Sequence, residues 1–167
     1  MNTVELLQYS LGNAFGILEQ VTADLTQEQA DWMPPGIANP IGSLYWHTIS
    51  STDMIVHGWG LGQPSLFETA GWQEKVVINA QEDPPPEMRD TRVDLAALRE
   101  YTSVVTGVVH GWLGSLTPED LERKVDTPIG ELGLAQMVET FIIWHINAHC
   151  GEISALKGCQ GFRGYPF

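Results

Sequence analysis

Residues 95–116, LAALREYTSVVTGVVHGWLGSL, carry the clearest structural signal in this sequence. Core-type side chains recur there at alternating steps of three and four residues: Leu95, Leu98, Thr102, Val105, Val109, Trp112 and Leu116. An α-helix places such positions on one face, and the unbroken alternation is typical of helices that pack at a shallow angle in a left-handed bundle. The stretch therefore predicts one long helix of an all-α bundle.

Three further segments show the same helical periodicity. They cover residues 3–22, about 41–60 and about 133–157. Asn39 and Pro40 suit the start of the second of these segments, and Gly158 suits the end of the last. We find no convincing strand pattern and no internal repeat. We therefore expect residues 1–167 to form a single domain, an all-α four-helix bundle.

A long connection separates the second and third predicted helices. Residues 61–90 contain several glycines and the run Pro84–Pro86, and they show no sustained period. Loops of this length in a compact domain are usually functional covers or disordered segments. Trp72, Val76 and Val77 are apolar, so we expect this loop to pack down on the helices.

Composition excludes several functions. Eight Lys and Arg residues against twenty-one Asp and Glu residues give a formal net charge of −13, which repels nucleic acid and anionic membrane surfaces. No stretch has the roughly 20 consecutive apolar residues of a membrane span, and the N-terminus does not resemble a secretory signal. We therefore predict a cytoplasmic protein. Cys150 and Cys159 lie too far apart along one helix to form a disulfide, so we expect free thiols.

The last predicted helix carries two histidines four residues apart, His145 and His149. On a helix this spacing stacks the two rings about 6 Å apart along the axis, so both can reach one ion. Such pairs also arise by chance. Here, however, the predicted apolar stripe of Leu134, Val138 and Phe141 includes them. Glu152 lies one turn further on the same stripe, and polar groups in an apolar interior must be satisfied by one another, by water or by an ion.

A third histidine, His47, lies next to core positions of the second helix. The following residues, 50–53, are Ser, Ser, Thr and Asp, which suggests a wet cavity. The alternative is a core histidine bonded to a backbone carbonyl. We expect His57 to be a surface or helix-end residue rather than a ligand. We expect His110 to face solvent or a neighbouring subunit.

Three other residues near the histidines have structural interpretations. Cys150 follows a histidine but points about 100° away from it, so we expect a small buried hydrophobe. Trp46 and Trp144 each precede a histidine, and we expect both to pack between helices. Arg163 is an ordinary surface arginine in this interpretation, although an anionic substrate could meet it.

The histidine segments 41–47, IGSLYWH, and 145–153, HINAHCGEI, resemble the DinB-like or YfiT-like metalloenzymes, a family of bacterial four-helix bundles. Segments 127–131 and 158–167 also look like family features. The resemblance implies that His47, His145 and His149 are the metal ligands. Relatives that act as thiol-dependent isomerases have a glutamate in place of His145, which argues against that subgroup here.

Three neutral imidazoles leave coordination positions open, as in catalytic zinc sites, and zinc, nickel and iron all accept such ligands. The resemblance implies either a hydrolase that uses activated water or a transferase that adds a low-molecular-weight thiol to an electrophilic small-molecule substrate. Glu152 would orient a ligand histidine or accept a proton, unless it is an ordinary exposed carboxylate.

Two alternatives belong to other classes of protein. One is a metal- or small-molecule-binding stress protein without turnover. The other, a di-iron bundle, needs two Glu-x-x-His motifs that this sequence lacks. A homodimer is also predicted, because the helix at residues 95–116 is apolar along its length, with Trp112 and His110 beside the stripe.

Overall fold

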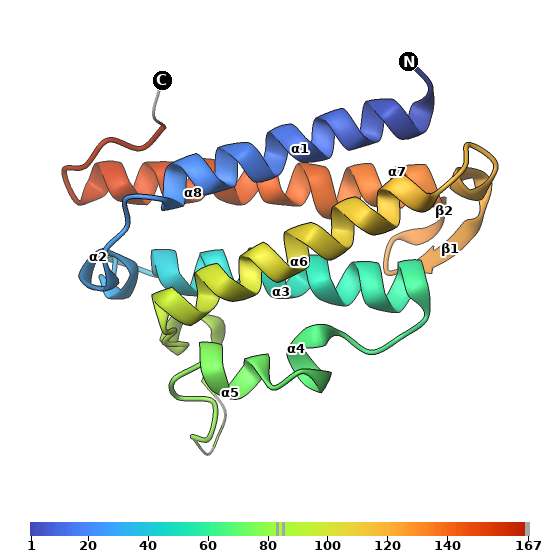
Figure 1. The fold of residues 1–167 in the computed structure, drawn as a ribbon. Coiled ribbons are helices and arrows are strands. Elements are labelled where there is room, and N and C mark those ends of the chain that lie inside the picture. The colour runs from blue at the N-terminus through green and yellow to red at the C-terminus, as the bar shows by residue number, and fades with distance from the viewer. Residues whose placement is uncertain (83, 85, 166–167) are drawn as a thin grey trace.

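The computed structural model describes residues 1–82, 84 and 86–165, and this part of the chain is mostly helical (Figure 1). Its long helical segments start with α1 (Thr3–Thr22), α3 (Ile41–Ile55) with its π-helical continuation η1 (Val56–Leu61), and α6 (Leu95–Ser115). The last segment consists of α7 (Leu134–Val138), the π-helical η4 (Glu139–Ile143) and α8 (Trp144–Cys159). These are the four segments that the hydrophobic periodicity predicted, and the last extends two residues beyond the expected end.

The four long segments pack around a common core. Helix α1 contacts α6 and α8, and α3 contacts the same two helices (Figure 1). The seam between α3 and α8 therefore lies across the core from the seam between α1 and α6. Side chains from all of these helices are fully buried between them, among them Leu11, Leu18, Ile49, Leu98, Val105, Ile142 and Ile146.

The apolar stripe expected along the last helix is wrong beyond residue 138. Leu134 and Val138 are buried as predicted, but from η4 onward the core positions are Ile142, Ile146, Cys150 and Ile153. A π-helical turn accommodates one extra residue, which rotates every later side chain by about 100° relative to a continuous α-helix. His145 and His149 are consequently half-buried beside α3 instead of pointing into the core.

A short hairpin corrects the expectation that the chain has no strands. Strands β1 (Lys124–Thr127) and β2 (Gly130–Gly133) pair antiparallel, and they follow the 3-10 turn η3 (Asp120–Glu122). Four-residue strands are too short to show an alternating pattern, and Val125 is the one buried residue of the two. Gly130 takes the positive φ of 112° that the turn requires.

The long connection packs down on the helices, as predicted. It contains the short helices α4 (Leu66–Thr69) and α5 (Trp72–Val76) and the 3-10 turn η2 (Met88–Asp90), none of which the sequence predicted. Val76 and Val77 are buried, and Val77 forms an isolated bridge with Val93. Another short helix, α2 (Gln27–Asp31), precedes α3. Pro85, within the expected proline run, and residues 166–167, within the expected family-like tail, lie outside the described residues.

A buried carboxylate, Asp53, joins this connection to the helices. Asp53 is fully buried and accepts hydrogen bonds from the Tyr101 hydroxyl at 2.6 Å and from the backbone N–H groups of Leu66 at 3.2 Å and Phe67 at 2.8 Å. His57 Nδ1 lies 2.7 Å from Asp53 Oδ1, the oxygen that also accepts from Leu66, and 3.0 Å from the Asp53 backbone carbonyl. We call Asp53, His57, Tyr101 and the start of α4 the Asp53 cluster.

The Asp53 cluster corrects the expectation that His57 is a surface residue. Its side chain is 7% exposed, because η1 continues α3 and keeps residue 57 above residue 53. Burial, together with the hydrogen bond to Asp53 and its negative charge, raises the pKa of Tyr101 far above its usual range. Tyr101 is therefore protonated at neutral pH and donates its hydroxyl proton to Asp53.

We expect Asp53→Ala to lower the free energy of unfolding by about 3–5 kcal/mol, because it leaves several buried donors without an acceptor. Urea unfolding followed by circular dichroism measures this change. Asp126→Ala removes an exposed carboxylate and should change the free energy by less than about 0.5 kcal/mol. Equal values for the two variants would show that the Asp53 cluster does not stabilise the fold.

Candidate metal centre

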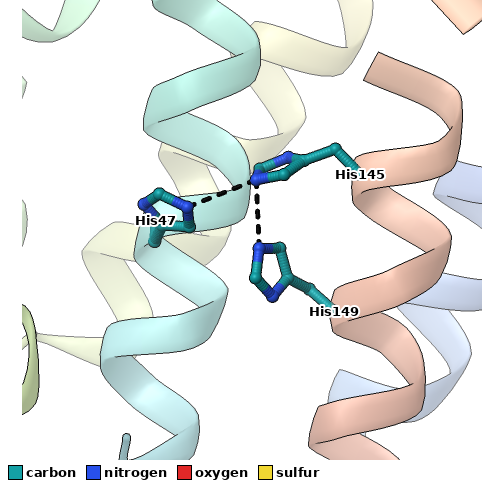
Figure 2. Close-up of side chains that lie close together, drawn as sticks. All are labelled: His47, His145 and His149. Atoms are coloured by element: carbon teal, nitrogen blue, oxygen red, sulfur yellow. Dashed lines mark hydrogen bonds between the residues drawn. The ribbon is translucent and has the colours of Figure 1, made fainter. Parts of the chain in front are cut away.

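Three histidines meet at the seam between α3 and α8, as Figure 2 shows. His145 Nε2 lies 3.2 Å from His47 Nε2 and 3.0 Å from His149 Nε2. One ring nitrogen of each histidine lies within 4.8 Å of the others, and all three side chains are half-buried. The structure therefore brings together the three residues that the sequence indicated, in a group that could hold a metal ion.

Hydrogen bonding among the three rings cannot satisfy them. A neutral imidazole has an N–H donor on one ring nitrogen and a lone pair on the other. His145 Nε2 therefore has either one proton to donate or one lone pair to accept with, which is too little for hydrogen bonds to both neighbouring nitrogens. His145 Nδ1 is moreover buried and has no hydrogen-bond partner among the described residues. A ring that carries its proton on Nδ1 would direct its Nε2 lone pair at the space between the rings. This donor set fits a divalent transition-metal ion.

The surroundings keep two of the rings neutral. Burial, aided by the nearby charges of His149 and His47, lowers the pKa of His145 to about 4. Burial and the charge of His149 also lower the pKa of His47, although Glu152 opposes this effect. Since only the deprotonated ring nitrogen binds a metal, both histidines are in their ligand form at neutral pH.

Glu152 lies beside the histidine group rather than within it. Its side chain is 56% exposed, and its Oε2 lies 2.5 Å from His149 Nδ1. A carboxylate that accepts the Nδ1 proton holds the ring in the tautomer whose Nε2 lone pair faces the other histidines. Ser51 Oγ lies 3.4 Å from His47 Nδ1, so it approaches the corresponding nitrogen of a second ring, at a longer distance.

Two of the four polar residues at 50–53, Thr52 and Asp53, are fully buried and bonded within the protein, so they do not line the wet cavity that the sequence suggested. The hydroxyls of Thr48 and Thr52 donate to carbonyls one turn back on α3, at 2.7 and 2.8 Å. Asp53 is used in the Asp53 cluster, which sequence reasoning missed. An Asp and a His four residues apart on one helix were the available signal for it.

Other residues near the histidines show two confirmed predictions and one wrong one. Cys150 is fully buried, and burial raises the pKa of its thiol to about 12, so it behaves as the expected small hydrophobe. Trp46 packs on Phe67 with ring centroids 6.0 Å apart. Trp144, in contrast, is 65% exposed, because the π-helical turn rotates it out of the helix interface.

These observations define a mostly helical domain with a three-histidine group between two of its helices. The family model described as the DinB superfamily matches residues 13–153. The chain therefore belongs to the DinB superfamily.

Two solved structures share the fold. A conserved protein from Enterococcus faecalis has a TM-score of 0.76 and 18% sequence identity, and the match covers 94% of this chain and 96% of that one. A DinB-like protein from Bacillus cereus has a TM-score of 0.60 and 17% identity, with 99% and 95% of the two chains covered. None of the curated proteins matches the sequence.

We expect the purified protein to bind about one divalent ion per chain and His149→Ala to abolish this binding, because two imidazoles hold such an ion poorly. Equilibrium dialysis against zinc, with metal quantified by mass spectrometry, measures the stoichiometry. His110→Ala removes a half-buried histidine that packs on Phe15 and should bind zinc as the wild type does. Full stoichiometry in the His149 variant would contradict the assigned ligands.

Proposed function

We propose that this protein is a metal-dependent enzyme whose ion is zinc, nickel or iron, held by His47, His145 and His149. It acts on a small-molecule substrate, either as a hydrolase that uses water or as a transferase that adds a low-molecular-weight thiol to an electrophile. The observation that carries the proposal is the convergence of three imidazole nitrogens within 4.8 Å at a half-buried seam. Membership of the DinB superfamily agrees with it.

The number of ligands favours catalysis over a structural role. Structural zinc sites usually have four protein ligands, whereas catalytic sites have three and leave a position for water or substrate. The group found among the described residues has three. When bound there, a divalent ion supplies the electrostatic pull that lowers the pKa of a water or thiol ligand.

In this proposal, residues of the chain orient a ligand histidine and take up a proton from the attacking water or thiol. Glu152 accepts the His149 N–H, so it holds that ring in place, and its exposed carboxylate can also take a proton from an incoming water or thiol. Burial keeps His145 and His47 neutral, so both can act as ligands. All three side chains are half-buried.

The cytoplasmic location and the homodimer remain predictions. Cys150 and Cys159 are free thiols, which agrees with the proposed cytoplasmic location. Within the described residues, no helix is long and apolar enough to cross a membrane. The homodimer was predicted partly from Trp112 and His110 beside the apolar stripe of α6. Trp112 is 7% exposed and His110 packs on Phe15 within the same chain, so these two residues no longer support a dimer.

We expect Glu152→Gln to retain the metal and to lower metal-dependent turnover by about ten- to a hundredfold, because glutamine cannot take up a proton. Zinc dialysis and a screen of hydrolysable esters and amides, and of thiols with electrophiles, provide the two measurements. Glu139→Gln changes an exposed carboxylate in η4 and serves as the control. Loss of metal in the Glu152 variant would show that this residue is a metal ligand. Unchanged turnover would show that it takes no part in the reaction. Metal binding without turnover on any substrate would favour the non-catalytic alternative.

Removal of the metal should lower the melting temperature without unfolding the protein. An ion that binds only the folded state stabilises it by mass action, by about 2.7 kcal/mol when its free concentration is a hundred times its Kd. The helical core, which is packed independently of the histidines, should hold the fold together. Circular dichroism melts with and without a chelator test this, and a fully unfolded spectrum after chelation would contradict it.

A further inference from the structure

A hollow of about 660 Å³ lies between α1 and α6, which run obliquely to each other (Figure 1). Its lining comes from both helices and from Tyr45, which reaches it from α3. The volume falls within the range of small-molecule pockets. None of the three histidines of the candidate metal centre lines it, so it is separate from that centre. We call it the α1–α6 hollow.

Two side chains of α6 in the lining also make contact with α1. The His110 ring packs on Phe15, with ring centroids 5.7 Å apart. Arg99 donates through Nη2 to the carbonyls of Thr22 and Ala23, at 3.0 and 3.2 Å. About 16 Å of helix separates Arg99 from His110, so the hollow extends over several turns between these two contacts.

Gly16, on α1, keeps part of this space open. A Cβ atom at this position would meet nothing within 4 Å. A glycine inside a helix destabilises it relative to alanine, so a glycine without a close packing contact calls for another reason. The space beside Gly16 is available to a ligand.

The buried part of the lining is aromatic. Phe15 is 6% exposed and Tyr45 is 3% exposed. Thr22 and Thr102 also line the hollow, but their hydroxyls donate to carbonyls of their own helices, each at 2.8 Å. This part of the hollow therefore suits an aromatic or other large apolar group.

Two opposite charges of the lining remain available. Glu19 is exposed, and no described Lys, Arg or His nitrogen lies within 4.0 Å of its carboxylate. Arg99 uses only Nη2 in its hydrogen bonds to α1, and its Nε and Nη1 make none to the described residues. A ligand with both an ammonium and a carboxylate group matches this pair, whereas a ligand of one charge would meet a like charge.

We propose that the α1–α6 hollow binds a free amino acid with an aromatic or other large apolar side chain. Its ammonium group pairs with Glu19 and its carboxylate with Arg99. Its side chain lies on the rings of Phe15 and Tyr45, in the space beside Gly16. The formal net charge of −13 disfavours an anionic ligand, and a net-neutral zwitterion avoids this repulsion. This site does not depend on the proposed metal chemistry.

A titration with L-phenylalanine, followed by NMR of the backbone amides, tests the proposal. The wild type should bind about one molecule per chain, and the amide signals of Gly12 and Gly16 should be among those that shift. Phenethylamine lacks the carboxylate and hydrocinnamate lacks the ammonium group. Each should bind about tenfold more weakly than phenylalanine, because each loses a charge-assisted hydrogen bond.

Four variants locate the ligand. Glu19→Gln should weaken phenylalanine about tenfold without weakening hydrocinnamate, which has no ammonium group. Glu28→Gln removes an exposed carboxylate on α2 and should change neither. Gly16→Leu fills the hollow and should abolish binding without lowering the melting temperature, since its Cβ enters open space. His149→Ala should bind phenylalanine as the wild type does, which excludes an amino acid chelated by a metal at the histidines.

Several results would overturn the proposal. It is wrong if the wild type does not bind phenylalanine, or if both analogues bind as tightly as phenylalanine. It is also wrong if Glu19→Gln or Gly16→Leu binds phenylalanine as the wild type does, or if His149→Ala loses binding. A wild-type dimer that Gly16→Leu dissociates, as measured by analytical ultracentrifugation, would instead make the hollow an interface between two copies of the chain.

Discussion

The position of the histidine group depends on one extra residue in the last long helix. The π-helical turn η4 rotates α8 by about 100° relative to α7, which turns Ile146, Cys150 and Ile153 into the core. His145 and His149 then lie against α3, where His47 meets them. On a continuous α-helix the two histidines would occupy core positions, closed to any substrate. The same rotation exposes Trp144, so a single local feature decides both the burial and the access of the site.

The protein surrounds the three rings with few polar contacts. Glu152 and Ser51 each approach the outer nitrogen of one ring, while the outer nitrogen of His145 has no partner among the described residues. The hydroxyls of Thr48, Ser50 and Thr52 donate to carbonyls of their own helix, and Asp53 is satisfied in the Asp53 cluster. The inner nitrogens are therefore left for one another or for an ion. The lack of other partners for the inner nitrogens is a physical reason to propose a metal at this group. The four-residue spacing of His145 and His149 is by itself a weak signal.

Buried polar groups recur where the long connection meets the helices. At one end Asp53 holds α4 through two backbone N–H groups and also binds Tyr101 and His57. At the other end the Arg89 guanidinium donates to the Pro34 carbonyl. Asp53 lies on α3, which also supplies His47, so this helix links the Asp53 cluster to the histidine group.

The sequence by itself determined where the long helices lie, because apolar residues recur at helical spacing in each of them, and this spacing is a local property. It also indicated His47, His145, His149 and Glu152, since one turn of helix sets the distances within α8. Tertiary structure alone decided which way these side chains face, because the π-helical turn is chosen by packing against the other helices. The hairpin at residues 124–133 is local, but its strands are too short to show an alternating pattern. The Asp53 cluster arises from contacts between residues far apart in the chain, such as that of Tyr101 with Asp53. Local periodicity carries no information about such contacts.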